Sequence, residues 1–265
     1  MQIGVSCLIL PADWSLADIC RETKAAGYEA LELVLRDEGE ISLQTPEAEL
    51  KKLADYARDE GMYLASVCPQ LGSQRPNLTH PDSAERARSV DTFRRAIDAV
   101  AAMGINNLLV VPGAVTSEVA YDEAYYRALQ GMQALAPHAE AAGVNLAIEY
   151  VWNKFLLSPM EFARFCDEVG SERVGFFFDT GNMVIFGFPE QWARICGRHL
   201  MKVHFKDFKR QGYQWTPLLE GDVDFPAVMA ELRRINYDDA VISEVSINTA
   251  SLEDTAQAIR KILEM

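Results

Sequence analysis

The sequence lacks the long apolar run that a membrane-spanning helix needs. None of its apolar stretches approaches the roughly 20 residues that cross a bilayer, and the first such run ends at Pro11. No basic segment precedes that run, so the N-terminus does not have the pattern of a secretory signal peptide. We therefore expect a cytoplasmic protein that does not bind membranes.

Positive charge is also scarce. The chain has 25 lysines and arginines against 39 aspartates and glutamates, a formal net charge of −14. Proteins that bind duplex DNA use Lys and Arg to neutralise phosphates. A local basic cleft is compatible with this composition, but the overall balance argues against nucleic acid and anionic membranes as partners and favours a small molecule.

Cysteine is infrequent, and there is no linker-like tract. The five cysteines are scattered without a CxxC pair, which predicts reduced, mostly buried thiols: Cys7, Cys20, Cys68, Cys166 and Cys196. No Pro/Ser/Gly-rich or low-complexity segment divides the 265 residues. We therefore predict one domain over residues 1–265, and a homo-oligomer is compatible with the sequence.

What the chain does contain is one repeated pattern. Short apolar runs rich in β-branched residues alternate with amphipathic helical segments, and glycines such as Gly143 and Gly170 stand where the helices should end. The pattern predicts eight strands, near 3–9, 29–34, 62–68, 106–111, 144–150, 174–179, 200–205 and 239–245. Strict alternation implies parallel strands, and eight such units predict an α/β fold, a single (β/α)8 TIM barrel. A doubly wound sheet is less favoured because no GxGxxG follows the first strand.

Polar side chains stand at the ends of the last four predicted strands: Glu149, Asp179, His204 and Glu244. In a barrel, the carboxyl ends of the strands meet at one rim, where catalytic residues gather. A single carboxylate at a strand end is usually a helix cap or an ion-pair partner. Three carboxylates close together repel one another unless a cation or protons offset them. Together with a histidine they form an oxygen-rich set that suits Mn²⁺, Mg²⁺ or Co²⁺, with Zn²⁺ as an alternative. A metal-free, salt-bridged rim is the structural alternative.

Five segments resemble one known superfamily: IEYVWNKFLLSP, FFFDTGN, KVHFKDFK, LLEGDVDFPAV and VISEVS. Together they are similar to the xylose-isomerase-like sugar isomerase/epimerase superfamily, nearest to its ketose 3-epimerases and sugar-phosphate isomerase/epimerases. The resemblance covers essentially the whole chain. It implies a metal-dependent TIM-barrel enzyme of carbohydrate metabolism, with the metal on Glu149, Asp179, His204 and Glu244. It also implies that Glu149 and Glu244 are the catalytic acid/base pair.

Two departures bear on the substrate. Ketose 3-epimerases that act on free hexuloses carry a histidine three residues after the aspartate ligand, where this chain has Asn182. They also have a further glutamate shortly after the first ligand, where this chain reads YVWNKFLL. Both differences argue against an unmodified hexulose, and the DTGN segment is more similar to the sugar-phosphate branch.

Six residues are candidates for contact with the substrate. Arg210 lies six residues after His204, at the spacing of a substrate-binding arginine in the ketose 3-epimerases. The other candidates follow strand ends: Trp14, Asn153, Lys154, Asn182 and Lys206. Asn153 could equally serve a turn. Glu32, near the end of the second strand, could reach the site or form a salt bridge within the barrel.

The functional hypothesis is epimerisation of a ketose or ketose phosphate at C3, through a metal-held cis-enediolate and without an organic cofactor. The alternative at the same metal site is an aldose–ketose isomerase of the sugar-phosphate, hydroxypyruvate or inosose type, or a dehydratase. An endonuclease IV-like nuclease shares the barrel but uses more histidines than the four present here. A non-catalytic barrel is disfavoured by the intact set of four ligands.

Overall fold

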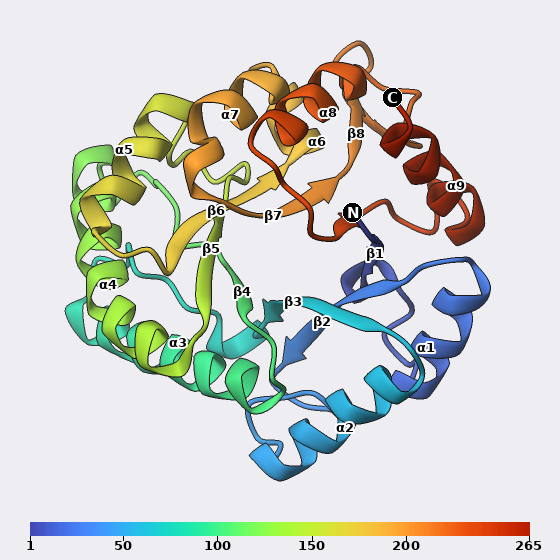
Figure 1. The fold of residues 1–265 in the computed structure, drawn as a ribbon. Helices are drawn as coiled ribbons and strands as arrows, with labels where there is room; N and C mark the ends of the chain where they lie inside the picture. The colour runs from blue at the N-terminus through green and yellow to red at the C-terminus, as the bar shows by residue number, and fades with distance from the viewer.

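The computed structural model describes residues 1–265, apart from the side chain of Ser73, and its centre is a closed barrel (Figure 1). Eight strands are parallel to their neighbours in the order β1-β10-β7-β6-β5-β4-β3-β2. Their bounds are β1 Ile3–Ser6, β2 Ala30–Arg36, β3 Tyr63–Gln70, β4 Asn107–Val110, β5 Asn145–Glu149, β6 Val174–Asp179, β7 Leu200–Phe205 and β10 Val241–Ser243. The predicted (β/α)8 barrel is confirmed.

Helices surround the barrel, as Figure 1 shows. The α-helices are α1 Leu16–Ala25, α2 Glu47–Asp59, α3 Ser83–Ala102, α4 Tyr121–Ala142, α5 Pro159–Val169, α6 Thr180–Val184, α7 Pro189–Cys196, α8 Phe225–Arg234 and α9 Leu252–Leu263. Three short 3-10 helices are η1 Cys7–Ile9, η2 Gly72–Gln74 and η3 Gly197–His199. Within the described part of the chain, no helix combines the length and apolar character that crossing a bilayer requires.

A small hairpin lies outside the barrel, on the loop that follows β7. Its strands are β8 Asp207–Lys209 and β9 Gln214–Thr216, paired antiparallel. Asp207 accepts hydrogen bonds from the backbone N–H groups of Phe208, Gly221 and Val223, at 2.9, 2.9 and 3.2 Å. This carboxylate therefore ties the hairpin to the loop that leads into α8.

The ends of the helices follow from local sequence. Ser158 caps α5 by accepting a hydrogen bond from the backbone N–H of Glu161, and Pro159 occupies the first helical position. Gly143 and Gly170 end α4 and α5 with φ of 70° and 76°, a left-handed conformation that glycine adopts without steric cost. These signals place each helix so that the next strand begins within a few residues.

Side chains alternate along a strand, so a residue two positions before a candidate ligand points to the same side as that ligand. Ala147, Phe177 and Ile242 belong to one buried apolar cluster inside the barrel, and each stands two residues before a candidate ligand. The fourth such residue, Lys202, is fully buried and reaches Asp239 at 2.5 Å. The candidate ligands therefore extend the inward-facing rows of the barrel beyond its packed core.

The predicted strand bounds agree to within a few residues, and β6 and β7 match over their full length. The largest difference is β10, which covers Val241–Ser243 and leaves Glu244 just beyond its end. All five cysteines are free and buried, as expected. The barrel extends along the chain from β1 to α9, and one domain over residues 1–265 remains a prediction.

Candidate metal centre

Four side chains converge at the carboxyl end of the barrel strands. Glu149 and Asp179 are the last residues of β5 and β6, His204 is the penultimate residue of β7, and Glu244 directly follows β10. Each offers one ligand atom, and these four atoms lie within 4.8 Å of one another. The structure thus brings together all four residues that the sequence singled out.

Their spacing fits a single divalent ion. Nδ1 of His204 lies 3.6 Å from Glu149 Oε1, 3.8 Å from Asp179 Oδ2 and 3.7 Å from Glu244 Oε2. Donor atoms about 2.0–2.2 Å from one tetrahedral ion would lie about 3.3–3.6 Å apart. Among the described side chains, His204 Nδ1 is a buried atom without a hydrogen-bond partner, and the buried Asp179 Oδ2 has no hydrogen bond but an ion-pair contact with Lys206. Since buried polar atoms are rarely left unpaired, both the spacing and the chemistry of the donors fit a metal; their role as ligands remains a prediction.

Glu32 fixes the orientation of the His204 ring from behind. It lies within β2, is fully buried, and accepts hydrogen bonds from Ser6 Oγ at 2.7 Å and Ser66 Oγ at 2.8 Å. Its Oε1 lies 3.0 Å from His204 Nε2. A proton on Nε2 satisfies this contact and leaves Nδ1 as the ring atom that faces the three carboxylates. Carboxylate–histidine pairs of this kind are a common support for metal ligands.

Asn182 and Lys206 hold the carboxylates in place. The side-chain amide of Asn182 donates to Glu149 Oε1 and to the backbone carbonyl of Tyr150, both at 3.1 Å. The Lys206 ammonium lies 2.5 Å from Glu244 Oε2 and 3.2 Å from Asp179 Oδ2. Both residues were expected to contact substrate, and the structure places both at the centre itself.

Burial and charge drive the pKa values of the two glutamates apart. Burial raises the pKa of Glu149 to about 7, and the charges of Glu244 and Asp179 act in the same direction. Burial also favours the neutral form of Glu244, but the charges of Lys206 and His204 outweigh it and lower the pKa of that carboxyl. Burial opposes a charged His204, yet the surrounding carboxylates, Glu32 first, raise its pKa well above the usual value. The centre therefore attracts positive charge strongly.

A cavity of about 410 Å³ opens onto this centre. Its wall includes Glu149, Asn182, Lys206 and Glu244. Arg75 is the only charged residue in the described remainder of the wall, which consists of Leu8, Cys68, Pro69, Gln70, Leu71, Gly72, Arg75, Pro76, Phe93, Leu109, Val111 and Val151. Ligand pockets in proteins commonly range from about 300 to 1,000 Å³. The cavity can therefore accept a molecule of the size of a sugar.

Arg210 and Asn153 lie in structural contacts away from the wall of this cavity. The Arg210 guanidinium donates to the backbone carbonyls of Val184 and Gly187, both at 2.7 Å. The Asn153 amide donates to the Gly113 carbonyl at 2.6 Å, and its oxygen accepts from the backbone N–H of Phe155. Neither contact is with the four ligands, and their predicted contact with substrate gains no support.

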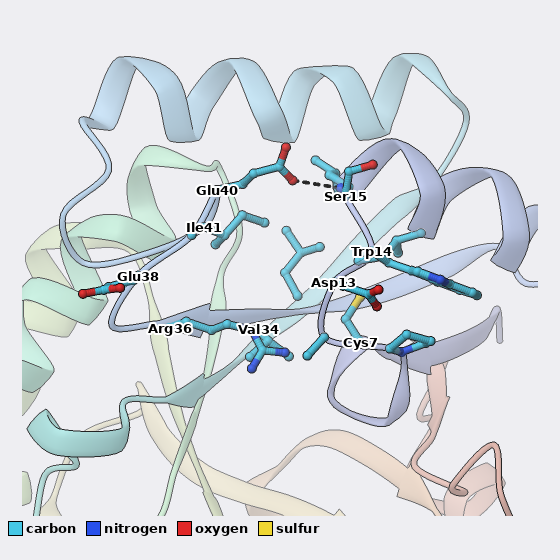
Figure 2. Close-up of a pocket in the computed structure, with 15 residues that line it drawn as sticks. Cys7, Asp13, Trp14, Ser15, Val34, Arg36, Glu38, Glu40 and Ile41 are labelled. Atoms are coloured by element: carbon cyan, nitrogen blue, oxygen red, sulfur yellow. Dashed lines mark hydrogen bonds between the residues drawn. The ribbon is translucent and has the colours of Figure 1, made fainter.

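Trp14 lines a second pocket, between the loops that follow β1 and β2 (Figure 2). This pocket has a volume of about 340 Å³, and Cys7, Arg36 and Glu40 also line it. Glu40 closes one side by accepting a hydrogen bond from the backbone N–H of Leu16 at 2.9 Å. The predicted role of Trp14 over the substrate therefore gains no support from its position.

In the segment after β5, Trp152 makes the contacts with the described residues around the centre, and Lys154, the predicted substrate contact, does not. Lys154 is exposed, with a left-handed φ of 62°. Trp152, two residues earlier, donates from Nε1 to the backbone carbonyl of Asn182 at 2.9 Å and stacks on Trp215 of β9 at 5.2 Å. The tryptophan pair thus connects the hairpin to the segment that carries Asn182.

Sequence reasoning missed part of the site. Glu32 was left undecided, although a carboxylate inside the apolar run ALELVL is a usable signal for a buried functional group. Ser6 and Ser66 gave no signal, because serine is common in strands and loops alike. Gln70 ends β3 and Arg75 follows it, but nothing in their spacing set them apart.

Comparison with known proteins agrees with the fold. A family model described as a xylose isomerase-like TIM barrel matches residues 20–264. The L-ribulose-5-phosphate 3-epimerase UlaE of Salmonella paratyphi C (strain RKS4594) is 25% identical over 272 residues, covering 98% of this chain and 92% of that protein. A crystal structure of D-psicose 3-epimerase in the presence of D-fructose has a TM-score of 0.82 at 22% identity, over 100% of both chains. A structure of L-ribulose 3-epimerase has a TM-score of 0.79 at 20% identity, over 99% of this chain and 94% of the other.

Proposed function

Because the chain belongs to the xylose isomerase-like TIM-barrel family, we propose that it is a divalent-metal-dependent ketose 3-epimerase acting on a sugar or sugar phosphate. The predicted family and the predicted enzyme class, sugar isomerase/epimerase, are both confirmed by the family match and by relatives named as epimerases. The observation that carries the proposal is the convergence of Glu149, Asp179, His204 and Glu244 on a cavity of sugar size.

The relatives support the position of the reacting carbon. The curated relative cited above is named an L-ribulose-5-phosphate 3-epimerase, and the match covers 98% of this chain. Inverting a carbon next to a carbonyl requires removal of a proton that is only weakly acidic. A divalent ion bound to the four ligands would supply Lewis-acid polarisation of the substrate oxygens, which makes that proton easier to remove. Mn²⁺, Mg²⁺ and Co²⁺ suit a donor set of three carboxylates and one imidazole.

Glu149 and Glu244 are the two groups that can move the proton. Both line the cavity, and β6 and β7 lie between the strands that carry them. Their carboxylates therefore approach a bound sugar from different directions. In the proposed reaction one glutamate takes the proton from the C3 carbon of the ketose, and the other delivers a proton to the opposite face of the same carbon. The difference in their surroundings, Asn182 at Glu149 and Lys206 at Glu244, suits two different roles.

The other residues of the site orient the pair and limit access of water. Asn182 holds Glu149 through its amide, and Glu32 fixes the ring of His204. The apolar part of the wall, including Leu71, Val111 and Val151, excludes water from the reacting carbon.

Turnover of a panel of ketoses and ketose phosphates, with Mn²⁺, Mg²⁺ or Co²⁺ added, tests this proposal. We expect the C3 epimer as product, and no product after removal of the metal by a chelator. Glu149→Gln and Glu244→Gln should each lower kcat by about 10²–10⁴-fold or more, the usual contribution of a general acid or base.

The matched control is Glu172→Gln, which changes an exposed glutamate in the loop before β6. This variant should retain wild-type rates. Full activity in either Glu149→Gln or Glu244→Gln would remove that residue from the mechanism, and an aldose as product would replace the epimerase with an aldose–ketose isomerase at the same site.

A further inference from the structure

Lys206 is the cation nearest to the proposed metal ligands. Its ammonium is within hydrogen-bonding distance of Glu244 Oε2, at 2.5 Å, and of Asp179 Oδ2, at 3.2 Å. The same two oxygens lie 3.7 and 3.8 Å from the donor atom of His204. Each oxygen therefore lies close to both the donor atom of His204 and the lysine ammonium. Two carboxylates from different strands that share one cation form the kind of bridge that a second metal ion would occupy.

The backbone of Lys206 is fixed in place by the residue that follows Asp179. The hydroxyl of Thr180 donates to the Lys206 carbonyl at 2.6 Å and accepts from the Lys206 N–H at 3.0 Å. Gly181 leaves the room that Lys206 needs, since a Cβ there would lie 2.6 Å from the Lys206 Cβ. The start of α6 therefore packs closely against the segment that follows β7, at Lys206.

The ammonium itself is enclosed as well. Only 16% of the Lys206 side chain is exposed, and Nζ lies 4.8 Å from the centroid of the Trp215 ring. An aromatic face stabilises a cation at this distance. Lys206 differs in this from Lys209, an exposed residue of the same hairpin.

The position of Lys206 affects the balance of charge at the centre. Glu149, Asp179 and Glu244 carry three negative charges when ionised, and one divalent ion leaves an excess of one. The ammonium of Lys206 balances that excess, whereas a second divalent ion would add more positive charge than the three carboxylates can offset. Glu32 lies on the far side of His204 and is held by two serine hydroxyls.

We propose that Lys206 is a positioning residue that acts as the fixed second cation of the metal centre, so that the centre binds one divalent ion and not two. The proposal rests on the proposed metal site. It predicts that the lysine repels the metal while it holds two of the ligands. If the lysine only held the ligands, removing its charge would weaken metal binding. As a fixed second cation, it instead lowers metal affinity, and removing its charge should strengthen binding.

The test is a titration of chelator-treated protein with Mn²⁺. Binding is measured by calorimetry and by the electron paramagnetic resonance signal of free Mn²⁺. The variants are Lys206→Met, which keeps most of the side-chain volume without the charge, and the control Lys209→Met. We expect one Mn²⁺ per chain in the wild type and in Lys209→Met, with the same affinity. Lys206→Met should bind Mn²⁺ about tenfold more tightly. Circular dichroism confirms that each variant is folded, and Lys206→Gln replaces Lys206→Met if the latter is not.

Several outcomes overturn the proposal. Lys206→Met, or Lys206→Gln in its place, could bind Mn²⁺ more weakly than the wild type or within threefold of its affinity. Either result would show that the charge of Lys206 does not oppose the metal. Two Mn²⁺ ions bound at this centre in the wild type, both lost in Glu244→Gln, would show that a second metal coexists with the lysine. Absence of Mn²⁺ binding in both wild type and Lys206 variants would overturn the metal site together with this proposal. Binding confined to the Lys206 variants would also overturn it, because the wild-type centre would then hold no ion.

Discussion

At the scale of the residue, the orientation of His204 is decided by groups on three other strands. Ser6 on β1 and Ser66 on β3 hold Glu32 on β2, and Glu32 lies against Nε2 of the histidine. The opposite nitrogen is then free to face the carboxylates. This network extends the site beyond its four proposed ligands, because loss of a supporting carboxylate changes both the tautomer and the basicity of a histidine ligand.

Glu32→Gln should therefore weaken metal binding by about 10–100-fold, the usual effect of losing such a support. The amide keeps the shape of the side chain but loses the charge that holds the proton on Nε2. Mn²⁺ titration of the variant measures the effect, with exposed Glu172→Gln as control. Wild-type affinity in Glu32→Gln would mean that the carboxylate serves only the stability of the barrel.

At the scale of the element, the site depends on the close contact between the start of α6 and the segment after β7. The backbone of Lys206 is bound by Thr180, and the ring of Trp215 lies over Gly181. Arg210 adds a further connection by donating to the carbonyls of Val184 and Gly187. Helix α6, which carries Asn182, is therefore held at its start by Lys206 and beyond its end by Arg210.

Gly181→Ala tests this contact. The new Cβ would lie 2.6 Å from the Lys206 Cβ and 2.8 Å from the Trp215 ring, so one of the two segments has to move. Overpacking of this kind costs about 1–3 kcal/mol of the free energy of unfolding, which urea denaturation would measure. Gly187→Ala is the matched control, because its Cβ would meet no atom closer than 3.4 Å. Equal stability of the two variants would contradict the close packing.

At the scale of the whole molecule, the barrel brings together ligands that are far apart in sequence. Glu149 and Glu244 stand on separate strands, and only closure of the sheet places their carboxylates beside His204. The unfolded chain cannot reproduce this arrangement, so a bound metal should stabilise the folded state.

Saturating Mn²⁺ should therefore raise the melting temperature. At a metal concentration of 100 times Kd, the gain in the free energy of unfolding is about 2.7 kcal/mol, which corresponds to roughly 5–10 °C for a chain of this size. Differential scanning calorimetry with and without a chelator measures the shift. Asp179→Asn should lose the shift, and an undiminished shift in that variant would place the metal elsewhere.

The sequence predicted the fold well because the signals involved are local and repeated. The alternation of strands and helices, with Gly143 and Gly170 ending two of the helices, needs no knowledge of tertiary contacts. The four candidate ligands were found because each stands where a buried strand ends, and parallel strands of a barrel end at one rim.

The rest of the site could not be predicted because it depends on distances between segments. Lys206 was expected to contact substrate, and its contacts with Asp179 and Glu244, which depend on its length and on the space beside Gly181, were not foreseen. Arg210 was chosen by its spacing from His204, while the hairpin directs its guanidinium to backbone carbonyls. Ser6 and Ser66 become meaningful only once three strands are paired side by side.

The most direct test of the central proposal is the position of isotope uptake during turnover in D₂O. The protein is incubated with Mn²⁺ and the best ketose or ketose phosphate of the panel, and the products are examined by nuclear magnetic resonance. Because two glutamates that exchange protons with solvent would act on one carbon, we predict the C3 epimer with deuterium at C3. Deuterium at C1 or C2 in an aldose product, or a C3 epimer formed without deuterium, would contradict the proposed two-base epimerisation.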